Sequence, residues 1–326
     1  MRATQPVSRP SPPDSRCEHC GLPFPKPPVT ETVDDTKRVF CSRMCRDAYL
    51  DHHPESPVYH GLDRVQTGVS GLDAQLPEGL PRNAFVLVTN SPGARWEALS
   101  AELVWRTLGR NEPVIIVTFQ ESPVSIVQQL LTFEWNVIPY LEDDQIHIID
   151  CFTYRVSSYD RVVSRFTDWN TYLYDVTDGA TTRLSDLDTM EGVHSQIDNV
   201  AERLGMRGKG VILIDSLYEL GTLTQPVHAH KFVKDVRADL SKGRFVPVFG
   251  GASTTVDESQ FPHNMTYLVD GLVELTLWQN GSLPGFQKHV RVPQVQGVTT
   301  HPQWIQFEYE SEHGMIVLDP MTQNAP

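Results

Sequence analysis

The chain has 326 residues, which is long enough for one large α/β domain with a small appendage. Its 41 acidic side chains outnumber its 27 Lys and Arg, and the formal net charge is -14. This charge disfavours nonspecific binding to nucleic acid or anionic lipid, although acidity is also typical of proteins from a high-salt cytoplasm. No apolar run approaches the ~20 residues that span a bilayer. Residues 1–16 lack the hydrophobic segment of a signal peptide, so we expect a cytoplasmic protein without membrane insertion.

The N-terminal part begins with a segment rich in Pro and Ser, residues 1–16, which we expect to be a disordered lead. Residues 17–53 follow and contain four of the five cysteines, in two close pairs. A C-x2-C turn and, about twenty residues later, C-x3-C at the start of a helix can supply four thiolates to one tetrahedral Zn²⁺. The predicted ligands are Cys17, Cys20, Cys41 and Cys45.

Two alternatives to this zinc site remain open. The four cysteines could be reduced thiols without a metal, and His19, His52 or His53 could replace one ligand. The fifth cysteine, Cys151, stands beside an apolar run and is interpreted as a core residue rather than a nucleophile.

The module resembles small zinc fingers of the FCS or treble-clef type, because an aromatic-Cys-Ser sequence, Phe40-Cys41-Ser42, precedes the last ligands. The resemblance covers about residues 16–51. In an acidic protein, such a finger implies a role in fold stability or protein docking rather than DNA reading. Nucleic acid stays a minor alternative because of four basic side chains in the module, Lys37, Arg38, Arg43 and Arg46.

Beyond a polar linker at residues 54–61, apolar strand patterns alternate with helical patterns. Such alternation predicts parallel strands joined by crossover helices. Predicted strands cover 85–89, 114–119, 146–149, 210–215 and 245–249, and predicted helices cover 98–108, 124–134, 190–204 and 227–240. Residues 154–189 are polar and without a clear period, so we expect a surface insertion there. Residues 269–318 alternate in the manner of antiparallel strands, one turn falling at 280–282, and a tail of 320–326 follows.

Two short sequences before the first buried strand identify a family resemblance. Thr67–Asp73 reads TGVSGLD, and Gly79-Leu80-Pro81 follows. The chain therefore resembles RecA/KaiC-like ATPases, of an archaeal type, over about residues 62–319, in a single copy. The resemblance implies a RecA-like parallel sheet with helices on both faces and C-terminal antiparallel hairpins, preceded by the zinc-binding module.

The turn after the first buried strand, Asn90–Glu97, stands where this family has its phosphate-binding loop. A working loop reads G-x-x-x-x-G-K-[S/T], in which Lys meets the phosphates and the hydroxyl meets magnesium. Here Gly93 is the one residue of a type that such a loop uses, Arg95 is the one cation, and the lysine and hydroxyl positions hold Trp96 and Glu97. We expect the indole to pack over the sheet edge where phosphate would lie.

The other catalytic positions that the resemblance implies are also altered. The pair of glutamates after the second strand falls on Gln120 and Glu121, and the acid of the Walker B strand is Asp215. The Lys-x-Arg pair that would reach a neighbouring subunit falls on Gln294 and Gln296. Phosphoryl transfer depends on such positioning and charge stabilisation, so these changes argue against ATP and Mg²⁺ as cofactors.

The leading hypothesis is a catalytically inactive KaiC/RecA-like protein that acts through protein contacts as a regulator or scaffold, with an unidentified partner. The first alternative is a protein that binds nucleotide through Gly93, Arg95 and Asp215 with weak or no hydrolysis. An active ATPase with an unconventional loop and a nucleic-acid filament are the remaining hypotheses. Because the loop lacks the cations that hold a bridging nucleotide, we expect a monomer or a weak dimer.

Overall fold

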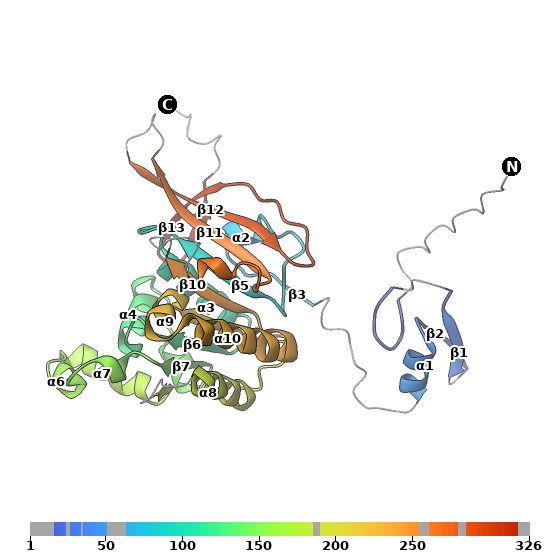
Figure 1. The fold of residues 1–326 in the computed structure, drawn as a ribbon, viewed down its shortest axis with the longest axis horizontal. Helices are drawn as coiled ribbons and strands as arrows, with labels where there is room; N and C mark the ends of the chain where they lie inside the picture. Colours follow the sequence, from blue (N-terminus) through green and yellow to red (C-terminus); the bar gives the residue numbers. More distant parts are fainter. Residues whose placement is uncertain are drawn as a thin grey trace. The chain divides into compact units, whose positions relative to one another are not determined.

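The computed structural model describes residues 16–23, 27–33, 35–50, 63–184, 190–253, 261–279 and 285–318. The chain divides into two compact units, Met1–Asp63 and Arg64–Pro326 (Figure 1). This boundary lies close to the expected linker. The predicted lead up to residue 15, the linker, the turn at 280–282, the tail, His52 and His53 lie outside the described residues.

The first unit is a hairpin followed by a helix. Strands β1 (Val29–Val33) and β2 (Thr36–Phe40) pair antiparallel, with Val29 opposite Phe40, and α1 (Arg43–Leu50) follows. Phe40 is fully buried and its ring centroid lies 5.2 Å from that of Tyr49 on the helix. Within the described residues of this unit the aromatic pair is a small core, so the unit needs a further source of folding free energy.

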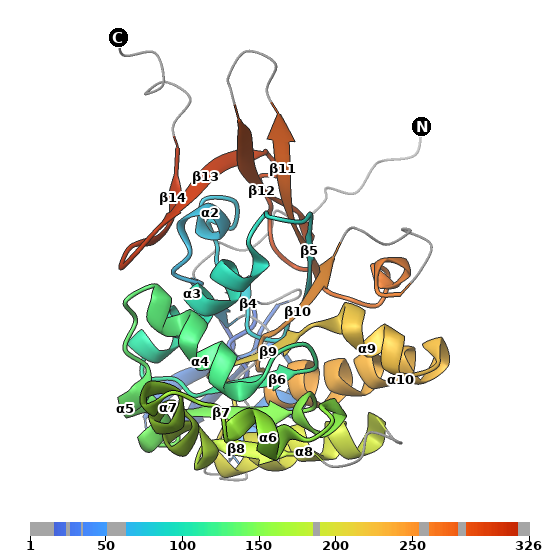
Figure 2. The same ribbon diagram turned by 90° about the vertical axis from the view of Figure 1, so that its left-hand side faces the viewer.

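The second unit is built on one ten-stranded sheet in the order β14-β13-β12-β11-β5-β10-β9-β6-β7-β8. From β11 to β8 each neighbouring pair is parallel, whereas β11 to β14 pair antiparallel (Figure 2). The strands are β5 (Phe85–Asn90), β6 (Val114–Thr118), β7 (Ile146–Asp150), β8 (Thr181–Arg183), β9 (Val211–Asp215), β10 (Val248–Ser253), β11 (Gly271–Gln279), β12 (Phe286–Val295), β13 (Ile305–Glu310) and β14 (Gly314–Val317). The expected RecA-like sheet with C-terminal antiparallel strands is confirmed.

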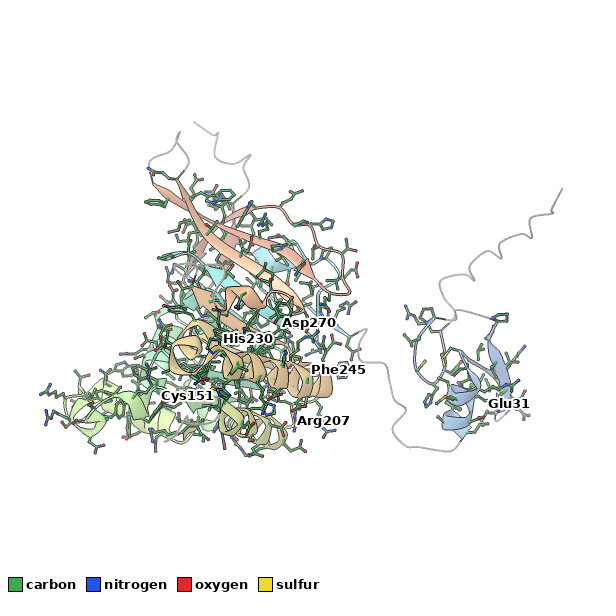
Figure 3. The ribbon with its side chains drawn as sticks, viewed as in Figure 1. Glu31, Cys151, Arg207, His230, Phe245 and Asp270 are labelled. Atoms are coloured by element: carbon green, nitrogen blue, oxygen red, sulfur yellow. The ribbon has the colours of Figure 1, made fainter. Side chains whose placement is uncertain are left out.

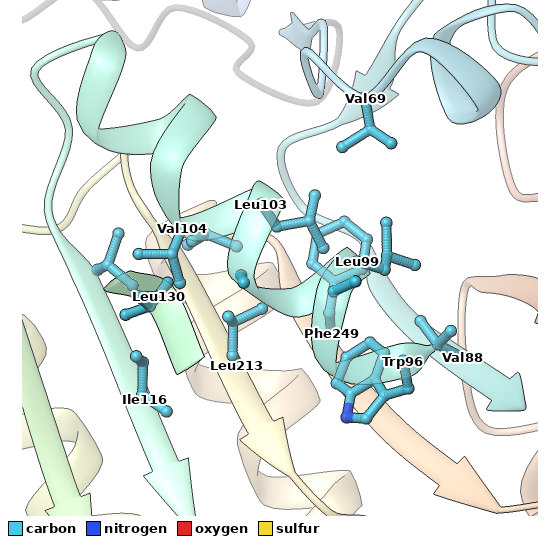
Figure 4. Packing of buried hydrophobic residues seen from close by; sticks show 14 of the residues in the cluster. Val69, Val88, Trp96, Leu99, Leu103, Val104, Ile116, Leu130, Leu213 and Phe249 are labelled. Carbon is cyan, nitrogen blue, oxygen red and sulfur yellow. The ribbon is translucent and has the colours of Figure 1, made fainter. Parts of the chain in front are cut away.

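Helices cover both faces of the parallel strands because successive residues of a strand point to opposite faces. On one face Val86 and Val88 of β5 join a cluster with α3, part of which Figure 4 shows. On the other face Phe85 and Leu87 pack with α8 and α10. The helices are α2 (Ser70–Asp73), α3 (Trp96–Gly109), α4 (Pro123–Thr132), α5 (Ile138–Glu142), α6 (Tyr159–Val163), α7 (Asp168–Asp178), α8 (Met190–Arg203), α9 (Leu217–Leu223) and α10 (Pro226–Val236). A short antiparallel pair, β3 (Arg64–Val65) and β4 (Leu80–Pro81), precedes β5.

Residues 154–189 were expected to form an irregular surface insertion, but their described part contains regular secondary structure. That part carries α6, α7 and β8, and β8 extends the main sheet by pairing parallel to β7 with Ile148 opposite Thr181. Helix α7 buries Leu173 and Thr177 and exposes Trp169 and Tyr172, so its large apolar side chains do not form a single core-facing stripe that the sequence would reveal.

Strand β10 also begins later than predicted. Residues Arg237–Gly243 form a π-helical turn after α10, and Phe245 then takes a left-handed φ of 56° that an extended strand cannot accommodate. The strand therefore runs from Val248 to Ser253, and its last residues reach the edge where β5 and β9 also end.

Candidate functional site

The turn between β5 and α3 is held by its own backbone and by β11. Ser91 N–H donates to the Leu275 carbonyl at 3.0 Å, and Ala94 N–H donates to the Ser91 carbonyl at 2.9 Å. Leu277 N–H donates to Ser91 Oγ at 3.0 Å. Gly93 has φ of +80°, and a Cβ there would meet Leu277 Cδ1 at 3.0 Å, so the glycine is required by conformation and by the close approach of β11.

Arg95, the one cation of the turn Asn90–Glu97, contacts a carboxylate and two aromatic rings of the same chain. Its Nε lies 3.1 Å from Glu97 Oε1. Its guanidinium carbon lies 5.6 Å from the Phe133 ring centroid and 6.0 Å from that of Tyr309, at cation-π distances. The backbone of Arg95 is left-handed with φ of 69°, a conformation that favours glycine, the residue type of this position in a working loop.

Trp96 fills the place expected for it. The indole is 6% exposed, and its Nε1 donates a 2.9 Å hydrogen bond to Asp215 Oδ1 at the end of β9. A Cβ on Gly251 of β10 would come within 2.5 Å of indole atoms. The ring therefore lies directly against the end of β10, at the border of the cluster in Figure 4.

Asp215 is the acid that the family motif places next to magnesium, and its surroundings are unfavourable for a charged carboxylate. Burial raises the pKa of Asp215, the Trp96 N–H lowers it, and the neighbouring Glu121 and Glu97 raise it, with a net shift upward. Beside it, Ser216 Oγ lies 3.4 Å from Gln120 Oε1. In the folded protein this carboxyl therefore holds its proton to a higher pH than a solvent-exposed aspartate does.

A cavity of about 290 Å³ opens at these strand ends. It brings together Trp96, Glu97, Glu121 and Asp215 of the predicted site, whereas Gly93 and Arg95 do not line it. The remaining lining residues are Asn90, Gln120, Gln129, Ser216, Tyr218 and Ser253. None of these lining residues is Lys, Arg or His, and Glu97 alone among the three lining acids has an ion-pair partner within the described residues, Arg95, so the lining is net negative.

The sequence interpretation did not single out five residues of this wall, which are Asn90, Gln129, Ser216, Tyr218 and Ser253. Two of them are the last residues of β5 and β10, a position that marks ligand sites in open parallel sheets and could have identified them. Gln294 and Gln296, the predicted Lys-x-Arg positions, lie near the end of β12 and do not line the cavity of their own chain.

The four predicted zinc ligands lie together in the first unit. Cys17 and Cys20 stand on a turn closed by Gly21 N–H donating to the Cys17 carbonyl, Cys41 follows β2, and Cys45 lies in the first turn of α1. All four Sγ atoms lie within 4.8 Å of one another. The Sγ atom of Cys41 lies 3.6 Å from Cys20 Sγ and 3.5 Å from Cys45 Sγ. A tetrahedron with Zn–S bonds of ~2.3 Å separates sulfurs by roughly 3.8 Å, so the geometry fits zinc.

The thiols of this cluster have unequal proton affinities. Burial raises the pKa of Cys17, but backbone N–H groups of Cys20, Cys41 and His19 outweigh it and lower the pKa to about 7. Burial and the neighbouring sulfurs raise the pKa of Cys41 to about 12. His19 is buried, and among the described residues the group of possible metal ligands consists of the four cysteines.

Cys151, the fifth cysteine, lies just past β7 and is fully buried (Figure 3). Burial and the charge of Asp150 raise the pKa of its thiol, which agrees with a core residue.

The sheet order, the strand–turn–helix at its edge and the acid at the end of β9 define a RecA-like P-loop ATPase fold. The family model described as "ATPase: KaiC" matches residues 65–322, and the chain belongs to this KaiC family. A model described as a MYM-type zinc finger with FCS sequence motif matches residues 11–49. Both expected resemblances are therefore confirmed.

Individual relatives match shorter parts of the chain. A UPF0273 protein of Thermotoga maritima is 34% identical over 98 residues, which is 30% of this chain and 40% of that protein. One of Saccharolobus solfataricus is 25% identical over 216 residues, 66% of this chain and 70% of its own. The chain spans about two-fifths of the length of the first curated relatives it matches.

Among solved structures, a KaiC-like protein from Pyrococcus horikoshii superimposes with a TM-score of 0.59 at 14% identity. The match covers 79% of this chain and 100% of that one, and it supports the fold. Among the helices of the described residues, none has the length and apolarity to span a membrane.

Proposed function

We propose that this KaiC-family protein neither hydrolyses ATP nor binds Mg-ATP tightly, and that it acts as a regulatory or scaffolding protein through protein contacts. The observation that carries the proposal is the hydrogen bond from Trp96 to Asp215. One side chain stands at the lysine position of the loop and also engages the acid that would serve magnesium. The zinc module supports the proposal because such fingers commonly serve fold stability and docking.

The energetic argument concerns the charge that a triphosphate would meet. Glu97 replaces a magnesium-binding hydroxyl and Trp96 replaces an ammonium group. Losing one attractive charge contact at ~4 Å, or gaining one repulsive contact, changes the energy by roughly 4 kcal/mol at a surface dielectric. Half of this, after solvent screening, still lowers affinity by more than about tenfold. Arg95 offers no compensation, because Glu97 and two aromatic rings hold its guanidinium.

The alternative function is nucleotide binding with weak or no hydrolysis. It is favoured by the persistence of the cavity and of Asp215 at the strand ends. The negative lining of the cavity disfavours nucleic acid as a partner. Because the loop lacks the cations that would hold a nucleotide between two subunits, we expect a monomer or at most a weak dimer.

The test is calorimetry with Mg-ATP together with a phosphate-release assay, using Trp96→Lys/Glu97→Thr as comparator. We expect no micromolar binding and no turnover by the unaltered chain, and tighter binding by the comparator. Micromolar binding without turnover would instead support the alternative. ATP turnover by the unaltered chain that disappears in Asp215→Ala would show an active enzyme. If the comparator binds Mg-ATP without hydrolysing it, Gln120 is the next position that would account for the missing hydrolysis.

A further inference from the structure

A second hollow lies next to the negative cavity, along α4. The second hollow has a volume of about 470 Å³ and is lined by Ser125, Gln128, Leu131 and Thr132 of α4 and by Trp169 of α7. Gln129 lines both spaces, so they meet at this side chain. Together they form one surface, called here the cleft–α7 groove.

The α7 side of the groove is a fixed aromatic platform. Trp169 is 52% exposed, and its ring lies 5.6 Å from that of Tyr172 on the same helix. Gln128 donates a 3.0 Å hydrogen bond to Asn170, and Leu173 is fully buried, so α7 is attached to α4 and to the core. A large exposed indole on a fixed helix is typical of contact residues, because it buries much apolar area at small entropic cost.

The cleft side of the groove lacks positive charge. Glu121 and Asp215 form no ion pair within the described residues, and the ion pair of Glu97 is made by Arg95, which does not line the cavity. Asp215 is partly buried and accepts its hydrogen bond from an uncharged indole. A ligand that brings a cation would supply the missing counter-charge where water is partly excluded.

We propose that the cleft–α7 groove binds an extended basic segment of a partner protein. An arginine or lysine side chain enters the cavity near Glu97, Glu121 and Asp215, and a neighbouring apolar side chain rests on Trp169. Charge complementarity selects this occupant over a nucleic acid, whose phosphates the carboxylates repel. The proposal rests on the proposed function, because Mg-ATP bound in the cleft would occupy the same space.

The test uses the full chain with zinc and a fluorescein-labelled, capped peptide of two arginines and two leucines separated by glycines. Matched peptides carry citrulline for arginine or glycine for leucine. We expect anisotropy to show about tenfold weaker binding of the citrulline peptide, since only charge differs. Glu97→Gln/Glu121→Gln should weaken the arginine peptide by a similar factor, whereas Glu78→Gln, at an exposed site outside the groove, should leave it unchanged.

The aromatic platform is tested separately. Trp169→Ala should weaken binding of the leucine-containing peptide about tenfold and leave the glycine-substituted peptide nearly unaffected. Equal affinity for the arginine and citrulline peptides, insensitivity to the double glutamate change, or preferential binding of a labelled oligothymidylate would each overturn the proposal.

The two proposals can fail independently. If neither Mg-ATP nor the peptide binds, the groove proposal alone is wrong. If Mg-ATP binds at micromolar concentration and displaces the arginine peptide, the groove is a peptide site, and the proposed loss of nucleotide binding is wrong.

Discussion

The indole of Trp96 and the carboxylate of Asp215 are joined by a 2.9 Å hydrogen bond across the start of α3 and the end of β9. In a working nucleotide site these two positions are bridged by phosphate and magnesium. Here the first residue of the helix contacts the acid directly. The connection between helix and sheet is therefore made by protein atoms alone.

Changing Trp96→Phe should cost about 1–2 kcal/mol of unfolding free energy, because the buried carboxylate loses its N–H donor while the aromatic packing is largely kept. Denaturant unfolding monitored by far-UV circular dichroism measures the change. On an Asp215→Asn background the same substitution should cost less, since the charged acceptor is absent. An unchanged cost in that double-mutant cycle would mean that the two side chains are not coupled.

Gly251→Ala should displace the Trp96 ring, because the new Cβ would come within 2.5 Å of indole atoms. We expect a loss of about 1–3 kcal/mol and altered tryptophan fluorescence. Gly179→Ala is the matched control, since a Cβ there meets nothing within 4 Å. Adding Trp96→Ala to Gly251→Ala should recover part of the loss, and the absence of any recovery would place the strain elsewhere.

Removing zinc should unfold the first unit, since the small core around Phe40 and Tyr49 cannot stabilise it alone. Metal analysis should find about one zinc per chain, and Cys41→Ser should abolish it. Amide resonances of residues 27–50 should then collapse to the narrow range of an unfolded chain. Cys151→Ala should keep its zinc. Dispersed resonances after exhaustive chelation would contradict a structural role for the metal.

Asp270→Asn should cost about 3 kcal/mol, because Asp270 is a buried acid paired with Arg237 at 2.7 Å and Lys242 at 2.8 Å. It also accepts the Phe85 N–H at 3.0 Å, which fixes the start of β5. Figure 3 labels its position. The exposed Asp239→Asn is the control and should change stability by less than about 0.5 kcal/mol.

The pH dependence of Asp270 follows from its lowered pKa. Burial raises the pKa, but Arg237 and Lys242 outweigh it, so the folded protein binds this proton only at lower pH than the unfolded chain. The stabilisation is present above about pH 4, the ordinary carboxyl pKa, and is lost as pH falls below it. Between about pH 5 and 3, unfolding free energy should therefore fall less steeply in Asp270→Asn than in the parent. Parallel curves would refute this pairing.

The sequence was sufficient for features that depend on neighbours in the chain. The apolar run of β5, the turn and the helix that follows were predicted, and the four cysteines were predicted from their spacing. Trp96 was expected over the sheet edge because its position in the loop is defined by the family motif.

Features that depend on distant packing were missed. Helix α7 buries Leu173 and Thr177, whereas its Trp169 faces solvent, so the apolar residues of its sequence do not mark the side that packs on the domain. Its attachment to α4 through Gln128 is decided by tertiary structure. The late start of β10 arises likewise from the π-helical turn before it, which has no reliable sequence signal.

The two edges of the main sheet limit how copies of this chain can join. The edge strands are short, three residues in β8 and four in β14. A second molecule that added a strand to either of these described edges would gain few backbone hydrogen bonds, and short edges of this kind protect sheet proteins against fibrous aggregation. Association of two copies at either of these edges would therefore depend mainly on side-chain contacts rather than on added strand pairing.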